Sequence, residues 1–253
     1  MRSRRRADGF TLVELMLAMA FVSMLLLAIA MTVIGIMHIY TKGLTMKAVN
    51  QAGRDVVADM KRTVGEGQVF TVGSKDGASP TYGMQPPFVL QKNLTGDVQT
   101  AVTDDQFGGR FCTGNYSYIW NIGRRATATD WPNKYDGTST EMPRLVKVKD
   151  SGAYCSIDGS GKLIKDKIES ADNPTELLSE ADLAIQDFQV EQLSGNLSTG
   201  QALYKFIVRI ASANSEALTT VGECRPPSDD VGLEDFCSVN DFVFTVKVSS
   251  IGG

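Results

Sequence analysis

Glu14 is the residue whose position most needs a chemical explanation. It directly precedes an apolar run, residues 15–40, that contains no Lys, Arg, Asp or Glu. A carboxylate inside hydrocarbon costs about 2.5 to 3.5 kcal/mol on insertion scales, so such a residue is usually kept because something pairs with it. His38 lies 24 residues further on, about 36 Å along a helix, so we exclude an internal partner. We therefore expect the partner to come from another molecule or from a new chain terminus.

The apolar run is long enough to span a bilayer, which takes roughly 20 mostly apolar residues. Four arginines, Arg2, Arg4, Arg5 and Arg6, precede it. Basic residues on that side predict a cytoplasmic N-terminus with the bulk of the chain exported. A secretory signal peptide would have a shorter apolar core and a small-x-small cleavage site. The run therefore predicts a single-pass membrane helix, although a plain membrane anchor would leave Glu14 unexplained.

The sequence GFTLVELMLAMA, which starts at Gly9, resembles the class III signal of type IV pilins and type II secretion pseudopilins. The similarity covers about residues 5–40. In that family a prepilin peptidase cuts after the Gly on the cytoplasmic side and methylates the new amine. The resemblance implies that residues 1–9 are a leader, and that cleavage leaves an N-methylated Phe10 at the start of a retained helix.

The resemblance also implies a partner for Glu14. The amine of Phe10 in one subunit would neutralise Glu14 of a neighbour as the helices pack side by side in a filament. The implied partners are the prepilin peptidase, other pilins or pseudopilins, the inner-membrane assembly platform and the cytoplasmic membrane. We expect a single-pass protein of the cytoplasmic membrane that then enters a filament at the cell surface or in the periplasm.

An amphipathic segment continues the apolar run. Its apolar residues recur at three- to five-residue steps between charged ones, and two glycines end the pattern. This predicts one helix from about residue 11 to residue 64, near 80 Å long at ~1.5 Å per residue. Residues 10–41 would form its membrane and assembly half, and residues 42–64 would pack on a head formed by residues 65–253.

The head reads as short runs rich in β-branched and aromatic residues, separated by Gly, Asp, Asn and Pro, which is typical of antiparallel strands. We expect strands at 88–91, 116–122, 145–149, 153–157, 184–193, 203–211 and 242–249. We also expect a hairpin turn at 158–161 and a short helix at 175–183, capped by Asn173 or Thr175. The fold class is thus α+β, with a long N-terminal helix packed on an antiparallel β-sheet head with disulfide-stapled loops.

Tyr116, Tyr118 and Trp120 alternate along one expected strand and therefore share one of its faces. Such an aromatic stripe is more often core or a cross-strand ladder than a ligand site. We expect it to lie in the core.

Four cysteines, Cys112, Cys155, Cys224 and Cys237, follow the predicted membrane span on its exported side. An even number there favours two disulfides, for which three pairings are possible. We favour Cys224 with Cys237, which closes a short loop, and Cys112 with Cys155. No Cys-x-x-Cys spacing occurs, which argues against a zinc knuckle or a thioredoxin-like site.

The loop between the last two cysteines carries the acids Asp229, Asp230 and Asp235. Calcium prefers such oxygen ligands, so these residues are the candidates for a calcium site. The EF-hand spacing is absent, however, and an acidic loop is usually just solvated. We expect no metal and no cofactor.

The charge of the chain argues against DNA as a partner. Without residues 1–9, which hold four Arg and one Asp, 21 basic residues stand against 28 acidic ones, a net charge of −7, whereas a nucleic-acid binder would be basic. The residues that could form a local basic patch are Arg124, Arg125, Lys147, Lys149, Lys162, Lys165 and Lys167. With one His and no Gly-x-Ser-x-Gly, His-Glu-x-x-His or P-loop motif, we expect no enzyme.

The resemblance favours a minor subunit of a type IV pilus or type II secretion pseudopilus, with a role in secretion, motility or adhesion. Many major pilins carry a Pro about twenty residues into the mature helix, but here none occurs before Pro80. The last 70 or so residues look like the carboxyl end of W-type minor pilins and J-type minor pseudopilins, which act near the filament tip in assembly initiation. The alternative is a tip adhesin or DNA-uptake receptor displayed on a pilin stem.

Overall fold

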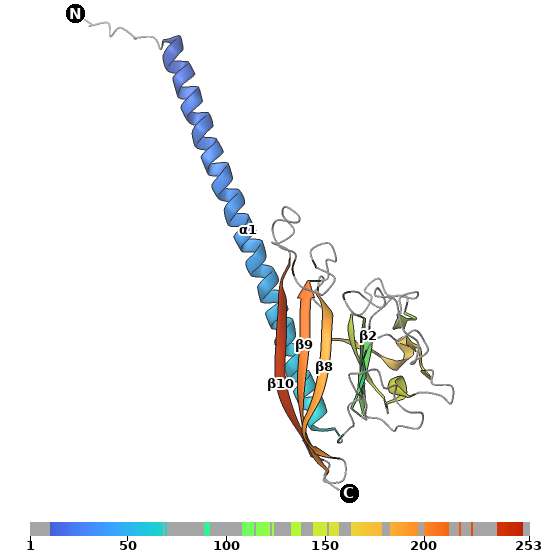
Figure 1. Ribbon diagram of the computed structural model, residues 1–253. Helices are drawn as coiled ribbons and strands as arrows, with labels where there is room; N and C mark the ends of the chain where they lie inside the picture. Colours follow the sequence, from blue (N-terminus) through green and yellow to red (C-terminus); the bar gives the residue numbers. More distant parts are fainter. Residues whose placement is uncertain are drawn as a thin grey trace, which may run out of the picture.

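One long helix, α1 (Leu12–Gly65), and a β-rich head beside its C-terminal half make up the computed structural model in Figure 1. The structure describes residues 11–67, 69, 89–91, 108–113, 115–121, 123, 133–137, 144–150, 152–156, 163–178, 183–196, 200–212, 218, 224 and 237–249. A long N-terminal helix followed by antiparallel sheets and two disulfides confirms the expected α+β architecture.

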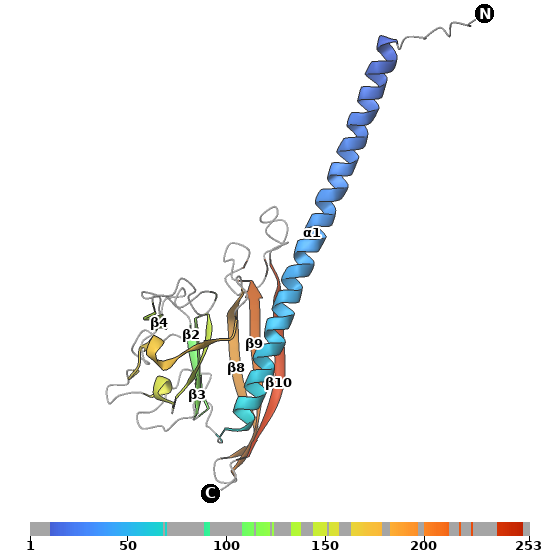
Figure 2. The same cartoon turned by 180° about the vertical axis from the view of Figure 1, so that it is seen from behind.

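The helix α1 has 54 residues and begins and ends within one residue of its predicted bounds. Its buried residues all lie in the C-terminal half: Val49, Ala52, Gly53, Val56, Met60, Thr63 and Val64. They recur at steps of one to four residues that keep them on one face, so this half is amphipathic as predicted and packs that face on the head. The N-terminal half extends beyond the head in both views (Figures 1 and 2).

A three-stranded antiparallel sheet covers the buried face of α1. It contains β8 (Leu183–Asn196), β9 (Gln201–Ser212) and β10 (Val239–Ser249) in the order β10-β9-β8. Alternate residues of β9 are buried against the helix, from Ala202 to Ile210. All three strands were predicted; β8 and β9 extend one to three residues past both expected ends, and β10 starts three residues earlier than expected and ends as predicted.

A second, five-stranded sheet lies beside β8 (Figures 1 and 2), and its Tyr118 and Lys147 also contact Asp59 of α1. Its order is β1-β2-β3-β5-β7, with antiparallel neighbours. The strands are β1 (Val89–Gln91), β2 (Gly108–Cys112), β3 (Tyr116–Asn121), β5 (Leu145–Lys149) and β7 (Thr175–Glu176). A parallel pair, β4 (Lys134–Tyr135) and β6 (Lys167–Ile168), completes the head.

Aromatic side chains join the two sheets into one core. Tyr118 and Trp120 of β3 are buried there, and Tyr116 packs against the same cluster, so the core position expected for this stripe is confirmed. The ring of Trp120 lies 4.3 Å from that of Phe188 on β8, measured between centroids. The other face of β3 packs on a separate small cluster, to which Ile119 belongs.

The strand expected at 153–157 is wrong. Ala153–Cys155 forms a short 3-10 helix, η1, which follows Gly152 at a φ of 80°. Gly readily adopts this left-handed conformation, which turns the chain out of the extended path. The hairpin turn expected at 158–161 lies outside the described residues, although the N–H of Ile164 donates to the carbonyl of Ser156, 3.0 Å away, across its flanks.

The short helix expected at 175–183 is also wrong for the residues described there, because Thr175 and Glu176 form β7 at the edge of the second sheet. The carboxylate of Glu176 accepts hydrogen bonds from three backbone N–H groups, including that of Arg144 at 2.6 Å. Asn173 does not cap the start of such a helix either, because it ends the 3-10 helix η2 (Ser170–Asp172) with a φ of 50°. Tertiary hydrogen bonds outweigh local helix propensity here.

Candidate functional site

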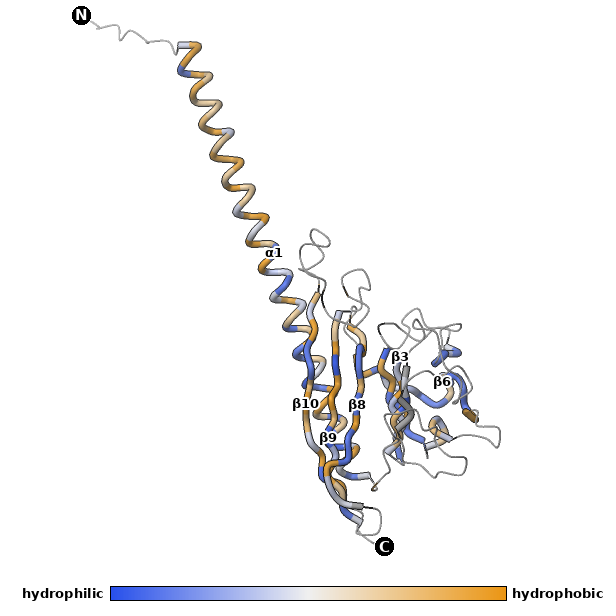
Figure 3. The backbone as a smooth tube through the Cα atoms, in the orientation of Figure 1, coloured by the Kyte–Doolittle hydropathy of each residue, from blue (hydrophilic) through white to orange (hydrophobic). Residues whose placement is uncertain are grey.

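The N-terminal half of α1 is the largest exposed apolar surface among the described residues. Its large apolar side chains from Leu12 to Tyr40 are each 49 to 76% exposed, and Figure 3 shows this half as a nearly continuous apolar tube. The helix is long and apolar enough to cross a membrane, and its most apolar 18-residue window is 0% buried. Exposed patches of far smaller area already mark interaction or membrane sites in soluble proteins.

Head contacts begin where this apolar surface ends. Val49 is the first fully buried residue of α1, and Asn50 accepts a hydrogen bond of 2.7 Å from the side chain of Asn240 on β10. Residues 12–40 alone extend about 43 Å at 1.5 Å per residue, more than the ~30 Å of a hydrocarbon core. The apolar half could therefore span a bilayer without bringing the head into it.

Glu14 lies in the first turn of α1 and forms a capping box with Thr11. One carboxylate oxygen accepts from the Thr11 N–H at 2.9 Å and from its hydroxyl at 2.8 Å, while the Glu14 N–H donates to the hydroxyl at 3.3 Å. This corrects the expectation that Glu14 lacks an internal partner. Both donors are neutral, however, so they satisfy hydrogen bonds of the carboxylate without cancelling its charge.

The predicted cleavage and methylation residues, Gly9 and Phe10, lie outside the described residues. Helical structure begins at Leu12, two residues after the predicted new terminus. The structure thus places Glu14 in the first turn of the helix, directly before the apolar run.

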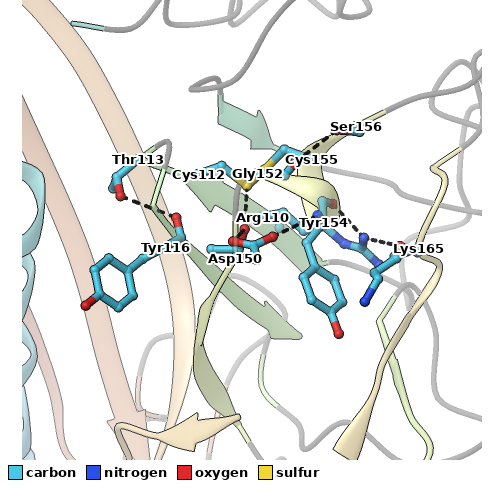
Figure 4. Close-up of a disulfide and its surroundings, with 12 residues drawn as sticks. Arg110, Cys112, Thr113, Tyr116, Asp150, Gly152, Tyr154, Cys155, Ser156 and Lys165 are labelled. Carbon is cyan, nitrogen blue, oxygen red and sulfur yellow. Dashed lines mark hydrogen bonds between the residues drawn. A yellow bond between two sulfur atoms is a disulfide. The ribbon is translucent and has the colours of Figure 1, made fainter. Parts of the chain in front are cut away.

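Both disulfides have the favoured pairing. Cys112 bonds Cys155 with 6.2 Å between Cα atoms, and Cys224 bonds Cys237 with 5.7 Å. The first ties β2 to η1 (Figure 4) and closes a separation of 43 residues; the second closes 13. In the chain-entropy model these loops correspond to about 4 and about 3 kcal/mol. They staple the head, and no described cysteine is left as a free thiol.

Arg110 lies beside the first disulfide and is fully buried (Figure 4). Its guanidinium donates to Asn133 Oδ1 at 2.7 Å, to the carbonyl of Tyr154 at 2.7 Å and to the carbonyl of Lys165. Burial lowers the pKa of Arg110 to about 10, against the opposing effect of Tyr154 and nearby acids. Sequence reasoning missed this residue because the Gly-Gly-Arg start of β2 lacks the usual pattern of a strand.

Asp59 connects the stem helix to the second sheet. Lys147 Nζ lies 2.9 Å from each Asp59 carboxylate oxygen and 2.8 Å from the Thr63 hydroxyl. The Tyr118 hydroxyl donates to the same carboxylate at 3.0 Å. This acid of α1 therefore has a charged partner within the chain, whereas Glu14 has none among the described residues.

The lysines considered as a basic patch do not gather on one surface. Lys147 pairs with Asp59. Lys165 instead pairs with Asp172 at 2.7 Å and with Glu169 at 3.2 Å. Lys149 and Lys167 are exposed, and Arg124, Arg125 and Lys162 lie outside the described residues. Among the residues that the structure describes, the members of this predicted patch therefore form no continuous basic face.

The calcium candidates Asp229, Asp230 and Asp235 also lie outside the described residues. Within the ranges that are described, no group of three or more His, Cys, Asp or Glu side chains could hold a metal ion.

The described part of the chain thus offers an exposed apolar helix with a carboxylate in its first turn, and a disulfide-stapled head beside the other half of that helix. No protein-family model, no curated protein and no solved structure matches the chain.

Proposed function

We propose that the protein is a structural, pilin-like minor subunit of a type IV pilus or type II secretion pseudopilus. In this proposal a prepilin peptidase cleaves after Gly9 and methylates the amine of Phe10. The mature protein then assembles through the apolar half of α1 and acts near the filament tip in assembly initiation. It has no catalytic role.

The observation that carries the proposal is that the chain leaves the apolar half of α1 uncovered. The most apolar window of the helix is 0% buried within the chain, and water is a poor solvent for such a surface. Lipid before assembly, and helices of neighbouring subunits after assembly, would both cover it. A plain membrane anchor would explain why lipid covers this surface, but it would not explain the carboxylate of Glu14.

The capping box sharpens the role of Glu14. Its two Thr11 donors satisfy one carboxylate oxygen, yet the negative charge stays without a cation among the described residues of the apolar half. An amine brought by a neighbouring subunit would cancel that charge in hydrocarbon, where Coulomb attraction is strong. This supports charge pairing between subunits in addition to capping within one.

Two features support a minor rather than a major subunit. The helix contains no proline, so the loosening that a proline introduces is absent from its first half. The second sheet also widens the head on the side of β8 (Figure 1). A subunit repeated along a shaft is surrounded by copies on all sides, whereas a tip subunit has more lateral room.

The test separates the charge of Glu14 from its capping role. Glu14→Gln keeps an amide that serves in a capping box and removes the charge, while Thr11→Val removes the capping hydroxyl and keeps the charge. We expect Glu14→Gln to be processed and inserted but to lose incorporation into sheared filaments, and Thr11→Val to incorporate at close to the normal level. Incorporation of Glu14→Gln at the wild-type level would contradict the proposal.

A further inference from the structure

Residues of α1 and β10 line a groove. In Figure 2, β10 is the strand of its sheet that lies farthest from the second sheet. The volume of the groove is about 430 Å³. Arg54, Val57, Ala58 and Lys61 form the helix wall, and Phe242 and its neighbours form the strand wall. The floor is apolar, and the two cations stand on one rim.

The cations of the groove belong to a longer stripe. Lys47, Arg54 and Lys61 are spaced seven residues apart, so they follow nearly the same face of α1 over about 21 Å. All three side chains are exposed, and no acid among the described residues forms an ion pair with them. The stripe is an exception on a chain that carries 21 basic and 27 acidic residues after Tyr40.

The acid that also lines the groove does not neutralise this stripe. Asp241 receives two hydrogen bonds from Arg209, at 2.7 and 3.0 Å. This arginine lowers the pKa of Asp241, against a smaller effect of burial. The charge of Asp241 is therefore compensated on the outer face of the sheet, and the groove remains basic.

The strand wall is a free sheet edge. β10 has 11 residues, pairs with β9 along its whole length, and has no second partner among the described strands. Val243, on the face away from α1, is 58% exposed. An open edge presents unpaired N–H and C=O groups to which another extended chain can add.

We propose that the groove binds an extended, acidic segment of another polypeptide, which adds to the sheet beside β10. Alternate side chains of such a strand point to opposite faces. Carboxylates on one face would meet Arg54 and Lys61, and apolar side chains on the other would cover Val243. The inference concerns the head alone and does not rest on the proposed function, since a chain that never enters a filament would still bind the segment.

The experiment uses the full chain in detergent micelles and a fluorescent, end-blocked heptapeptide of alternating valine and glutamate. We expect saturable binding that weakens with salt, and slower hydrogen exchange of the backbone amides in 239–249. The double variant Arg54→Glu with Lys61→Glu should weaken binding at least ~10-fold, because like charges then face each other. The control, Lys149→Glu with Lys167→Glu, makes the same change in net charge at exposed sites elsewhere and should bind normally.

Four results would overturn the proposal. The first is equal binding by the corresponding peptide of alternating valine and lysine, and the second is an equal loss of binding in the control variant, because neither is expected from recognition by this groove. The third is normal binding by a peptide N-methylated at every second residue, which lacks the donors for one strand edge. The fourth is a large gain in affinity when Asp229, Asp230 and Asp235 are changed to Asn, because the chain's own loop would then be the occupant.

Discussion

The two halves of α1 are continuous in the backbone and opposite in their partners. In the second half the buried face packs on the sheet, and Asp59 has a charged partner, Lys147, within the chain. In the first half the apolar side chains are exposed, and among the described residues Glu14 has only the neutral donors of Thr11. The comparison teaches that a helix can be complete in hydrogen bonds and still incomplete in burial and charge.

The largest difference between the two halves is expected when a carboxylate is placed in each of them. Val56 is 1% exposed and Val22 is 51% exposed. Val56→Asp should destabilise the head by ~4 kcal/mol or more, because it buries an unpaired charge. Val22→Asp should leave head unfolding unchanged and impair membrane insertion. Thermal unfolding in detergent micelles, followed by near-UV circular dichroism, measures the first effect; equal melting temperatures for the two variants would contradict the division.

The two acids of the helix give the next largest contrast. Asp59→Asn removes the charge that Lys147 faces and should cost the head about 2 kcal/mol, typical of a lost hydrogen bond to a charged group. Glu14→Gln should not change head stability at all. Urea unfolding of both variants provides the comparison. A similar loss in each would mean that Glu14 supports the fold rather than an external contact.

Two glycines allow a finer test with the same substitution. A Cβ at Gly53 would overlap the ring of Phe242, whereas a Cβ at Gly35 would meet no atom within 4 Å. Gly53→Ala should therefore lose about 1 to 3 kcal/mol to overpacking, offset in part by the ~1 kcal/mol that Ala gains over Gly in a helix. Gly35→Ala should leave the melting temperature of the head unchanged. The Phe242→Leu background should restore most of the loss, and its failure to do so would remove this explanation.

The smallest expected effect is a pH dependence confined to the head. Burial is the main cause that raises the pKa of Tyr118, so the folded state keeps this proton where the unfolded chain releases it near pH 10. The stabilisation is complete below pH 10 and falls as pH rises above it, by up to ~1.4 kcal/mol per pH unit. Tyr118→Phe should flatten that fall, measured as the urea midpoint between pH 9 and pH 11. The lowered pKa of Arg110, about 10, acts in the opposite direction. If the stability of Tyr118→Phe fell with pH as steeply as that of the wild type, another group would be the cause of the fall.

Much of the fold follows from periodicity, and the exceptions have physical causes. β5 (Leu145–Lys149) lies where its alternating pattern predicts it. β2 was missed because it begins with two glycines, and Gly109 is needed there since a Cβ would overlap the ring of Trp120 on the next strand. A glycine that is needed because a neighbouring strand approaches closely does not make its own segment look like a strand in the sequence.

Some features of the candidate site could also be recognised in the sequence, and others could not. The apolar run and the position of Glu14 could be recognised in the sequence because they depend on residue type and spacing. The capping box was missed although Thr11 and Glu14 have its spacing. The partnership of Asp59 with Lys147, which are 88 residues apart, had no local signature.

By itself, the amino-acid sequence determined the length of α1, its change from apolar to amphipathic, and the number of cysteines available for disulfides. Those properties depend on the order of side chains along one segment. Only the tertiary structure decided which half of the helix is covered, which cysteines meet, and that β10 is an edge strand among the described strands, beside a basic helix flank. Each of these depends on segments far apart in the chain that packing brings together.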